Sequence, residues 1–248
     1  MGKQRPCIAG LMAAVWMTVQ YLVRVRPWMY TWGADPDEVS AALPGDELVG
    51  AAVPRTTRAV TIDAPAEMVW KWLVQIGEGR GGFYSYSWLE RAVGARIHNA
   101  QTVHPEWQHA QIGDPIWLAR RYGDIACLNV VALKPNSHLV LLSEEDFARV
   151  RRGGKARGAW AFYLERTNGR TRLVARSSGG EVGHFVFDVV HFVMEQKMLR
   201  SIRHRAEQTF REHIQANSHL TRLSEKRCQQ ASLRRNTRYR NLKHTEAQ

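Results

Sequence analysis

The feature that most constrains the fold is a hairpin signal in the second half of the chain, "GAWAFYLERTNGRTRLVARS". Two runs in which apolar and polar residues alternate flank Asn168-Gly169, a dipeptide typical of a two-residue type I′ turn. Because the turn fixes the pairing of the strands, it predicts three facing pairs: Leu164 with Leu173, Phe162 with Ala175, and Glu165 with Arg172. The first two pairs should be buried, and the third should be an attractive charge pair on the other face.

A long amphipathic helix is predicted after the hairpin, from about Val189 to Gln215, with Asp188 as its cap. Its apolar stripe comprises Phe192, Leu199, Ile202, Ala206 and Phe210. Further strand signals lie at 57–63, 115–119, 125–133 and 138–144, and a helix over 65–76 ends at Gly77. The order of elements predicts an α+β domain with helices on one side of an antiparallel sheet.

The N-terminus carries an uncharged apolar run of 17 residues, Cys7 to Val23, between basic residues. Trp28, Tyr30 and Trp32 follow it, as aromatic rings do at the level of lipid headgroups. We predict an apolar helix over residues 1–26 that anchors the chain in a membrane, with orientation undetermined because both flanks are basic. The alternative is a helix that is buried or lies on a surface, in a cytoplasmic protein.

The net charge of +12 is unevenly distributed. Residues 1–195 hold 22 Lys and Arg against 19 Asp and Glu, whereas residues 196–248 hold 13 against 4. The body of the protein is therefore nearly neutral and lacks a recognition motif, so nucleic-acid binding is not expected to be its main function. Residues 216–248 are basic and poor in aromatics, which predicts a disordered tail able to contact anionic lipid.

Several ordered blocks of sequence carry a family resemblance: "RPWMYTWGADPDEVSAALPGDEL", "TRAVTIDAPAEMVWKWLVQIGEGRGGFYSYSWLE", "GRTRLVARS" and "HFVMEQKMLRSIRHRAE". Over roughly residues 26–212 the chain resembles a membrane-anchored bacterial subgroup of the START-like superfamily, also called SRPBCC or polyketide cyclase/dehydrase. Asp35-Pro36 stands where Thr or Ser is more usual after "WGA". The resemblance implies a helix-grip fold, a curved antiparallel sheet around the long C-terminal helix with an apolar cavity between them. It implies no catalytic residues for this chain.

The sequence thus predicts four parts: an N-terminal helix at 1–26, a connecting segment with a short helix at 27–56, a helix-grip domain at 57–215, and the tail at 216–248. In the connecting segment, Asp35, Pro36 and Glu38 form a capping-box signal for the short helix.

The glycines of "GEGRGG", residues 77–82, match the spacing of a dinucleotide-binding loop. That loop requires a strand before it and a helix after it, whereas here a helix precedes. We therefore expect no cofactor. The glycines instead allow a tight turn, and Arg80 is expected to pair with Glu78 or with an anionic group of a ligand.

Histidines do not predict a metal site, because "HPEWQH" lacks the ligand spacing of a zinc motif. His191 and Glu195 lie four residues apart beside the apolar stripe of the long helix. Two interpretations stay open: a structural pair, or an acid and base that act on a substrate.

The leading functional hypothesis is binding of a hydrophobic small molecule or lipid in the internal cavity. The residues predicted to line it are Arg80, Tyr84, Tyr86, Trp88, Trp107, Trp117 and His191. A second hypothesis is a cyclase, dehydratase or hydrolase that uses His191 and Glu195. A third is an interaction module in which side chains fill the cavity and the basic tail binds a partner.

Overall fold

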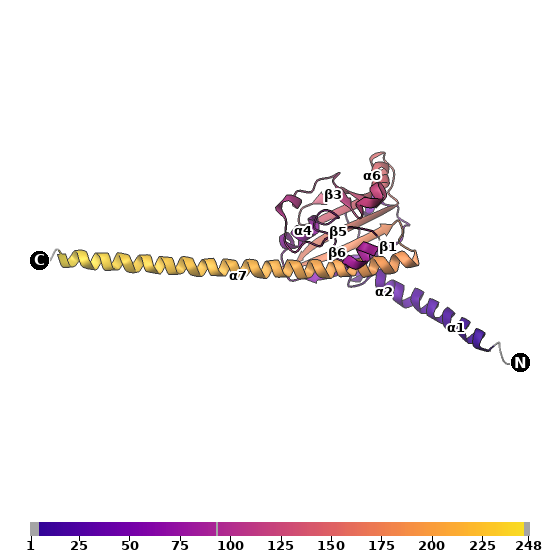
Figure 1. The fold of residues 1–248 in the computed structure, drawn as a ribbon, viewed down its shortest axis with the longest axis horizontal. Helices are drawn as coiled ribbons and strands as arrows, with labels where there is room; N and C mark the ends of the chain where they lie inside the picture. Colours follow the sequence, from indigo (N-terminus) through magenta and orange to yellow (C-terminus); the bar gives the residue numbers. More distant parts are fainter. Residues whose placement is uncertain (1–4, 93, 246–248) are drawn as a thin grey trace. The chain divides into compact units, whose positions relative to one another are not determined.

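The computed structural model describes residues 5–92 and 94–245, with side chains for 10, 12–92, 94–219 and 221–222 (Figure 1). The chain forms two compact units, residues 1–207 and 208–248. The first unit contains all the strands of the sheet and every residue of the candidate site.

The centre of the first unit is a six-stranded antiparallel sheet with the strand order β1-β6-β5-β4-β3-β2 (Figure 1). Its strands are β1 (Arg55–Ile62), β2 (Pro115–Trp117), β3 (Cys127–Lys134), β4 (His138–Ser143), β5 (Gly158–Thr167) and β6 (Arg170–Gly179). The first strand pairs with the last, so β1 closes one side of a meander formed by β2 to β6. Together with the long helix α7 (Phe185–Thr245), this sheet confirms the predicted α+β helix-grip architecture.

The β5–β6 hairpin has the predicted register, with Leu164 opposite Leu173 and Phe162 opposite Ala175. Both turn residues have positive φ, 51° at Asn168 and 78° at Gly169, as a type I′ turn requires.

Glu165 lies opposite Arg172 as predicted, but the expected charge pair is replaced by another. The Arg172 guanidinium donates to both carboxylate oxygens of Glu38, at 2.6 and 2.8 Å. A two-point contact with a guanidinium fork is stronger than a cross-strand pair at the surface.

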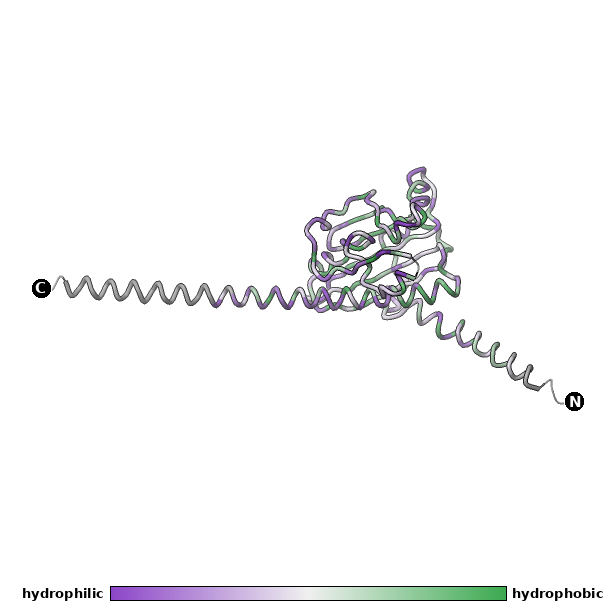
Figure 2. Tube along the Cα trace, viewed as in Figure 1, coloured by the Kyte–Doolittle hydropathy of each residue, from purple (hydrophilic) through white to green (hydrophobic). Residues whose placement is uncertain are grey.

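Helix α7 begins at Phe185, four residues earlier than predicted. Asp188 is therefore inside the first turn rather than at the cap, and its carboxylate accepts hydrogen bonds from the Gly183 N–H and the Tyr30 hydroxyl, at 3.0 and 2.7 Å. The predicted stripe is buried at Phe192, Leu199, Ile202 and Ala206. Figure 2 shows the first turns of this helix as predominantly hydrophobic.

Shorter elements surround the sheet. They are α2 (Arg26–Tyr30), α3 (Pro36–Ser40), η2 (Asp46–Leu48), α4 (Ala66–Val74), α5 (Ser87–Ala92), η3 (Pro105–Trp107), η4 (Arg120–Ala126) and α6 (Glu144–Arg151). The capping box at the start of α3 is confirmed, because the Glu38 carboxylate accepts from the Asp35 N–H at 2.7 Å. The segment that follows α3 is held by buried Arg176 on β6, which donates to Asp46 at 2.5 Å and to the Ala41 carbonyl at 2.9 Å.

The N-terminal segment differs from the predicted transmembrane anchor. Helix α1 (Arg5–Gln20) has 16 residues and is followed by a π-helical turn, η1 (Tyr21–Val25). Within the described part of the chain, no helix combines the length and apolarity needed to cross a bilayer.

The C-terminal segment also differs from the prediction, since α7 continues as helix to Thr245 where a disordered tail was expected from residue 216. The reason is local, because residues 184–248 contain neither Gly nor Pro and are rich in Arg, Lys, Gln and Glu. These residues have high helix propensity, so nothing in the backbone chemistry ends the helix.

The hairpin turn provides a test of the sheet. Replacing Asn168 and Gly169 together by valine should lower the free energy of unfolding by about 2–4 kcal/mol, because a β-branched residue at positive φ costs roughly 1–3 kcal/mol. Chemical denaturation measures this loss. The control Asn168→Asp keeps an Asp-Gly turn and should lose under about 1 kcal/mol; equal losses in the two variants would contradict the turn assignment.

Candidate functional site

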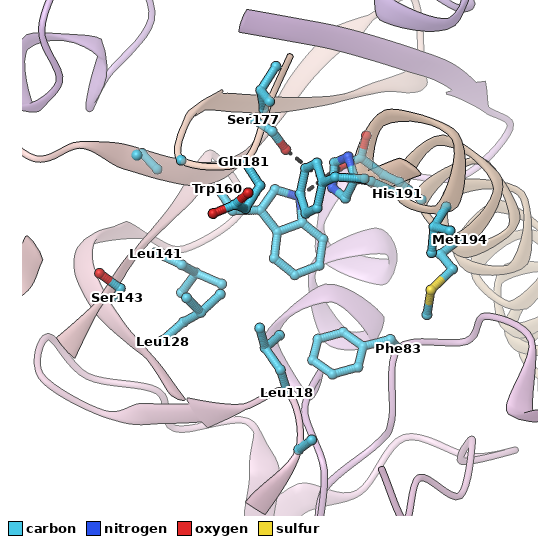
Figure 3. A pocket seen from close by; sticks show the side chains of 18 of the residues that line it. Phe83, Leu118, Leu128, Leu141, Ser143, Trp160, Ser177, Glu181, His191 and Met194 are labelled. Carbon is cyan, nitrogen blue, oxygen red and sulfur yellow. Dashed lines mark hydrogen bonds and ion pairs between the residues drawn. The ribbon is translucent and has the colours of Figure 1, made fainter. Parts of the chain in front are cut away.

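A cavity of about 550 Å³ lies in the first unit, between the sheet and the first turns of α7 (Figure 3). Its wall is mostly apolar, with Phe83, Leu118, Leu128, Leu141, Trp160, Phe187, Val190, Met194 and Met198. Figure 3 shows the rings of Phe83 and Trp160 and the chain of Met194 around the hollow. Its volume falls in the range of pockets that bind small molecules.

On β5, side chains that face α7 alternate with side chains on the opposite face of the sheet. On β5, Trp160 and Phe162 contact each other on the face toward α7, with ring centroids 4.8 Å apart. Ala161 and Tyr163 pack on the opposite face with Ala59 and Val140. Side chains two residues apart on a strand share a face, so the same alternation that specifies the hairpin also selects the residues that meet the helix.

A buried polar cluster lies at one end of the cavity wall. The Arg58 guanidinium on β1 donates to the Glu195 carboxylate on α7 at 2.6 Å, and also to the Met29 carbonyl at 2.7 Å. The Trp160 indole N–H donates to the other oxygen of Glu195, also at 2.6 Å. Both Arg58 and Glu195 have side chains almost fully buried, so this is an ion pair inside the core.

His191 completes the cluster, one turn before Glu195. Its Nδ1 lies 3.1 Å from the Arg58 guanidinium and its Nε2 lies 3.4 Å from the Ser177 hydroxyl. The ring stacks on Phe187 at 5.1 Å between centroids. Ser177 and His191 both line the cavity, where Figure 3 shows them facing each other.

The charges in the cluster follow from these contacts. Burial lowers the pKa of His191 and so favours the neutral ring. Burial opposes ionisation of Glu195, but its interactions with His191 when that ring is protonated, with the charge of Arg58, and with the hydrogen bonds from Arg58 and Trp160 lower its pKa. With His191 neutral, Arg58 and Trp160 are the groups that stabilise the carboxylate. Because a guanidinium can only donate, Nδ1 of neutral His191 must accept and the ring proton belongs on Nε2.

This arrangement bears on the two interpretations of the His191–Glu195 pair. A general base needs a free lone pair within reach of the substrate. The Nδ1 lone pair is directed at Arg58, and each oxygen of Glu195 accepts a short hydrogen bond. The geometry therefore favours a structural pair, in which Nε2 of His191 lies 3.4 Å from the Ser177 hydroxyl and 3.6 Å from the Glu195 carboxylate.

A second buried carboxyl group lines the cavity, that of Glu90 on α5. The residue is 1% exposed, and neither of its side-chain oxygens has a hydrogen-bond partner. Burial raises the pKa of Glu90 to about 7, against the smaller opposing effects of Arg91 and the Ser85 backbone. This group is therefore close to half protonated at neutral pH.

The glycine-rich turn does not line this cavity. Gly77 and Gly82 pair with each other through two backbone hydrogen bonds of 3.1 Å, which closes a tight loop. Arg80 does not pair with Glu78 and does not line the cavity. Its guanidinium donates to the Val74 and Trp107 carbonyls at 3.1 and 2.8 Å. The Glu78 carboxylate instead accepts from the backbone N–H groups of Arg96 and Arg120.

Of the residues predicted to line the cavity, only His191 does so. Tyr84 is buried beside the turn, where its hydroxyl accepts from Gln75 and donates to the Trp72 carbonyl. Tyr86 and Trp88 are exposed at the surface. Trp107 stacks on His104 at 4.2 Å, and Trp117 lies under the Arg120 guanidinium.

Sequence reasoning missed Trp160, Ser177, Arg58 and Glu90. A signal for the first two was present, because Trp160 has the parity of Phe162 and Leu164, and Ser177 that of Leu173 and Ala175. Arg58 gave no such signal, since a charged residue in an alternating strand is normally assigned to the exposed face.

The described residues contain no cluster of His, Cys, Asp or Glu that could hold a metal ion. The sequence matches no family model and no curated protein.

Solved structures similar to the chain include protein MLL2253 from Mesorhizobium loti, with 16% identity, a TM-score of 0.38, and coverage of 63% of this chain and 98% of the other. Protein NE0264 from Nitrosomonas europaea has 12% identity and a TM-score of 0.40, covering 65% and 98%. The Aha1 dimer from Colwellia psychrerythraea has 16% identity and a TM-score of 0.37, covering 62% and 96%. Because these TM-scores are below 0.5, the fold assignment rests on the strand order of the sheet and on helix α7.

The buried ion pair can be tested by removing one of its charges and then both. Arg58→Met leaves the Glu195 carboxylate buried without its partner and should lower the free energy of unfolding by about 3–5 kcal/mol. Arg58→Met combined with Glu195→Met removes both charges and should recover most of that loss.

Urea unfolding measures each variant, with Arg166→Met as the control. Arg166 pairs with Glu67 at the surface, where both side chains are largely exposed, so its loss should cost under about 1 kcal/mol. A similarly small loss for Arg58→Met would show that the cluster contributes no more than a surface pair.

Proposed function

We propose that this protein binds a hydrophobic small molecule or lipid in the cavity between the sheet and α7. The observation that carries the proposal is the apolar cavity of about 550 Å³ at a packed core, with a few oriented polar groups on its wall. Protein interiors are close-packed, and an unfilled space of this size forfeits contacts on all sides. A bound apolar molecule would restore them.

Carriage or sequestration of the ligand is favoured over chemistry on it. Each oxygen of Glu195 accepts a short hydrogen bond, and the His191 Nδ1 faces Arg58. The START-like resemblance of the sequence points to the same class of function. The interaction-module hypothesis is disfavoured because the cavity is open rather than filled by side chains.

Cavity binding can be tested with the neutral fluorophore N-phenyl-1-naphthylamine, whose emission rises in an apolar site. The full chain should bind it saturably. Leu118→Trp places a larger ring at the cavity wall and should weaken binding at least about ten-fold, while Leu22→Trp, outside the cavity, should not. Equal binding by both variants, or no saturable binding by the wild type, would refute the proposal. Native mass spectrometry of the purified chain would identify a retained ligand.

We also propose that the N-terminal segment lies on a membrane surface. Its exposed apolar residues are Met12, Val15, Trp16, Met17, Val19, Leu22 and Val23. A helix with this much exposed apolar area needs a partner, and Trp with flanking Arg24 and Arg26 suits a lipid interface. The net charge of +9 over residues 196–248 would add attraction to anionic lipid.

Co-sedimentation with phosphatidylcholine vesicles, with and without phosphatidylglycerol, tests the membrane proposal. Trp16→Glu should weaken binding by about ten-fold or more, since burial of a large apolar side chain contributes roughly 1.5–3 kcal/mol. The control Trp88→Glu changes a tryptophan of similar exposure elsewhere in the chain, 63% against 64%. Equal binding by the two variants would contradict the proposal, and stronger binding to anionic vesicles would support the contribution of the basic segment.

A further inference from the structure

The carboxyl group of Glu90 is the polar group of the cavity wall that the proposed function leaves unexplained. The residue is 1% exposed and lines the cavity, and neither of its side-chain oxygens has a partner with the geometry of a hydrogen bond, although the Ser85 backbone lies near enough to oppose slightly the rise in pKa that burial causes. A buried polar group without a partner costs about 1–3 kcal/mol, and more if it is charged. Such a group is retained at a cost to folding, unless a ligand supplies the partner.

The other carboxylates of the cavity wall are already paired. Glu195 accepts from Arg58 and Trp160. Asp146 accepts from the backbone N–H groups of Arg157 and Gly158, at 3.0 and 3.1 Å. Glu181 is exposed, with its carboxylate 3.8 Å from His184. Glu90 therefore differs from the other three in being both buried and unpaired.

The charges of the side chains that line the cavity indicate which charge the head group of the ligand carries. The ionisable side chains among the described residues that line the cavity are Glu90, Asp146, Glu181, His191, Glu195 and Tyr122, without a Lys or Arg. His191 is held neutral by burial. An anionic head group would meet only acidic and neutral groups here, whereas a cationic one would find a carboxylate in a medium of low dielectric constant.

We propose that Glu90 receives the head group of the ligand and that this ligand is a hydrophobic amine. The inference rests on the proposed function, because it assigns a head group to the molecule bound in the same cavity. An ammonium donates to the carboxylate oxygens in a charge-assisted hydrogen bond, which is stronger than a neutral one. The apolar remainder of the molecule then lies against Phe83, Leu141 and Trp160.

A matched set of single-chain compounds tests this assignment: decylamine, decanol and decanoic acid, each displacing N-phenyl-1-naphthylamine from the full chain. The measurement is made near pH 8, where Glu90 is mostly ionised and the amine still carries its proton. Decylamine should bind at least about ten-fold more tightly than decanoic acid, with decanol between them.

Glu90→Gln keeps the shape of the side chain and removes its charge, so the preference for decylamine should fall to about three-fold or less. Glu181→Gln, which removes an exposed carboxylate of the same cavity, should keep the preference. Retained binding of the neutral fluorophore shows that each variant has folded with its cavity.

The outcomes separate the two proposals. If the fluorophore binds but decylamine and decanoic acid compete equally, or if Glu90→Gln leaves the preference unchanged, the assignment of Glu90 is overturned and cavity binding stands. If the fluorophore does not bind the wild type, both proposals fail. If decanol binds as tightly as decylamine, a neutral hydroxyl satisfies Glu90 as well as an ammonium does, and the proposal that the ligand is an amine is refuted.

Discussion

The ion pair between Arg58 and Glu195 is the interaction on which the rest of the domain depends. It joins the edge strand β1 to the closing helix α7 at 2.6 Å, and the same guanidinium holds the Met29 carbonyl of the N-terminal segment. Burying two charges is costly, and the cost is offset only where hydrogen bonds satisfy the groups that remain. Trp160 and His191 supply those bonds, so four elements of the fold are fixed by one cluster.

A cavity lies beside this cluster, and Trp160, His191 and Glu195 belong to both. Phe83, Leu141 and Met194 face this space from separate elements. Arg58 directs Nη1 at Glu195 and Nε at the Met29 carbonyl, while its buried Nη2 has no hydrogen-bond partner. The rest of the wall is mostly apolar, which suits an apolar molecule.

The distribution of partners among the acidic groups then distinguishes structure from recognition. Glu195 and Asp146 accept hydrogen bonds from the protein itself. Glu90 reaches the same cavity with none. Both kinds of group are buried carboxyls, and only the count of donors around each one separates a structural contact from a group available to a ligand.

Much of the fold could be predicted because it is specified locally. Asn168-Gly169 fixed the hairpin register through backbone conformation, and Asp35 with Glu38 fixed the start of α3 through a capping box. The exit of the chain from α4 followed from Gly77. Predicted ion pairs failed where a competing partner lay far away in sequence. Arg172 donates to Glu38 instead of Glu165, and Arg80 donates to the Trp107 carbonyl instead of Glu78.

The site was less predictable than the fold for the same reason. The aromatic residues after the glycine turn were expected inside. Phe83 lines the cavity, but Tyr86 and Trp88 are exposed and Tyr84 packs beside the turn.

By itself, the sequence determined the α+β class, the hairpin register and the apolar stripe of α7, because each depends on the periodicity of neighbouring residues. Only the tertiary structure decided that Arg58 lies inside, that His191 is an acceptor, and that Glu90 faces the cavity without a partner. Those properties depend on which groups meet across the core, and residues 58 and 195 are brought together only when β1 and α7 close on each other.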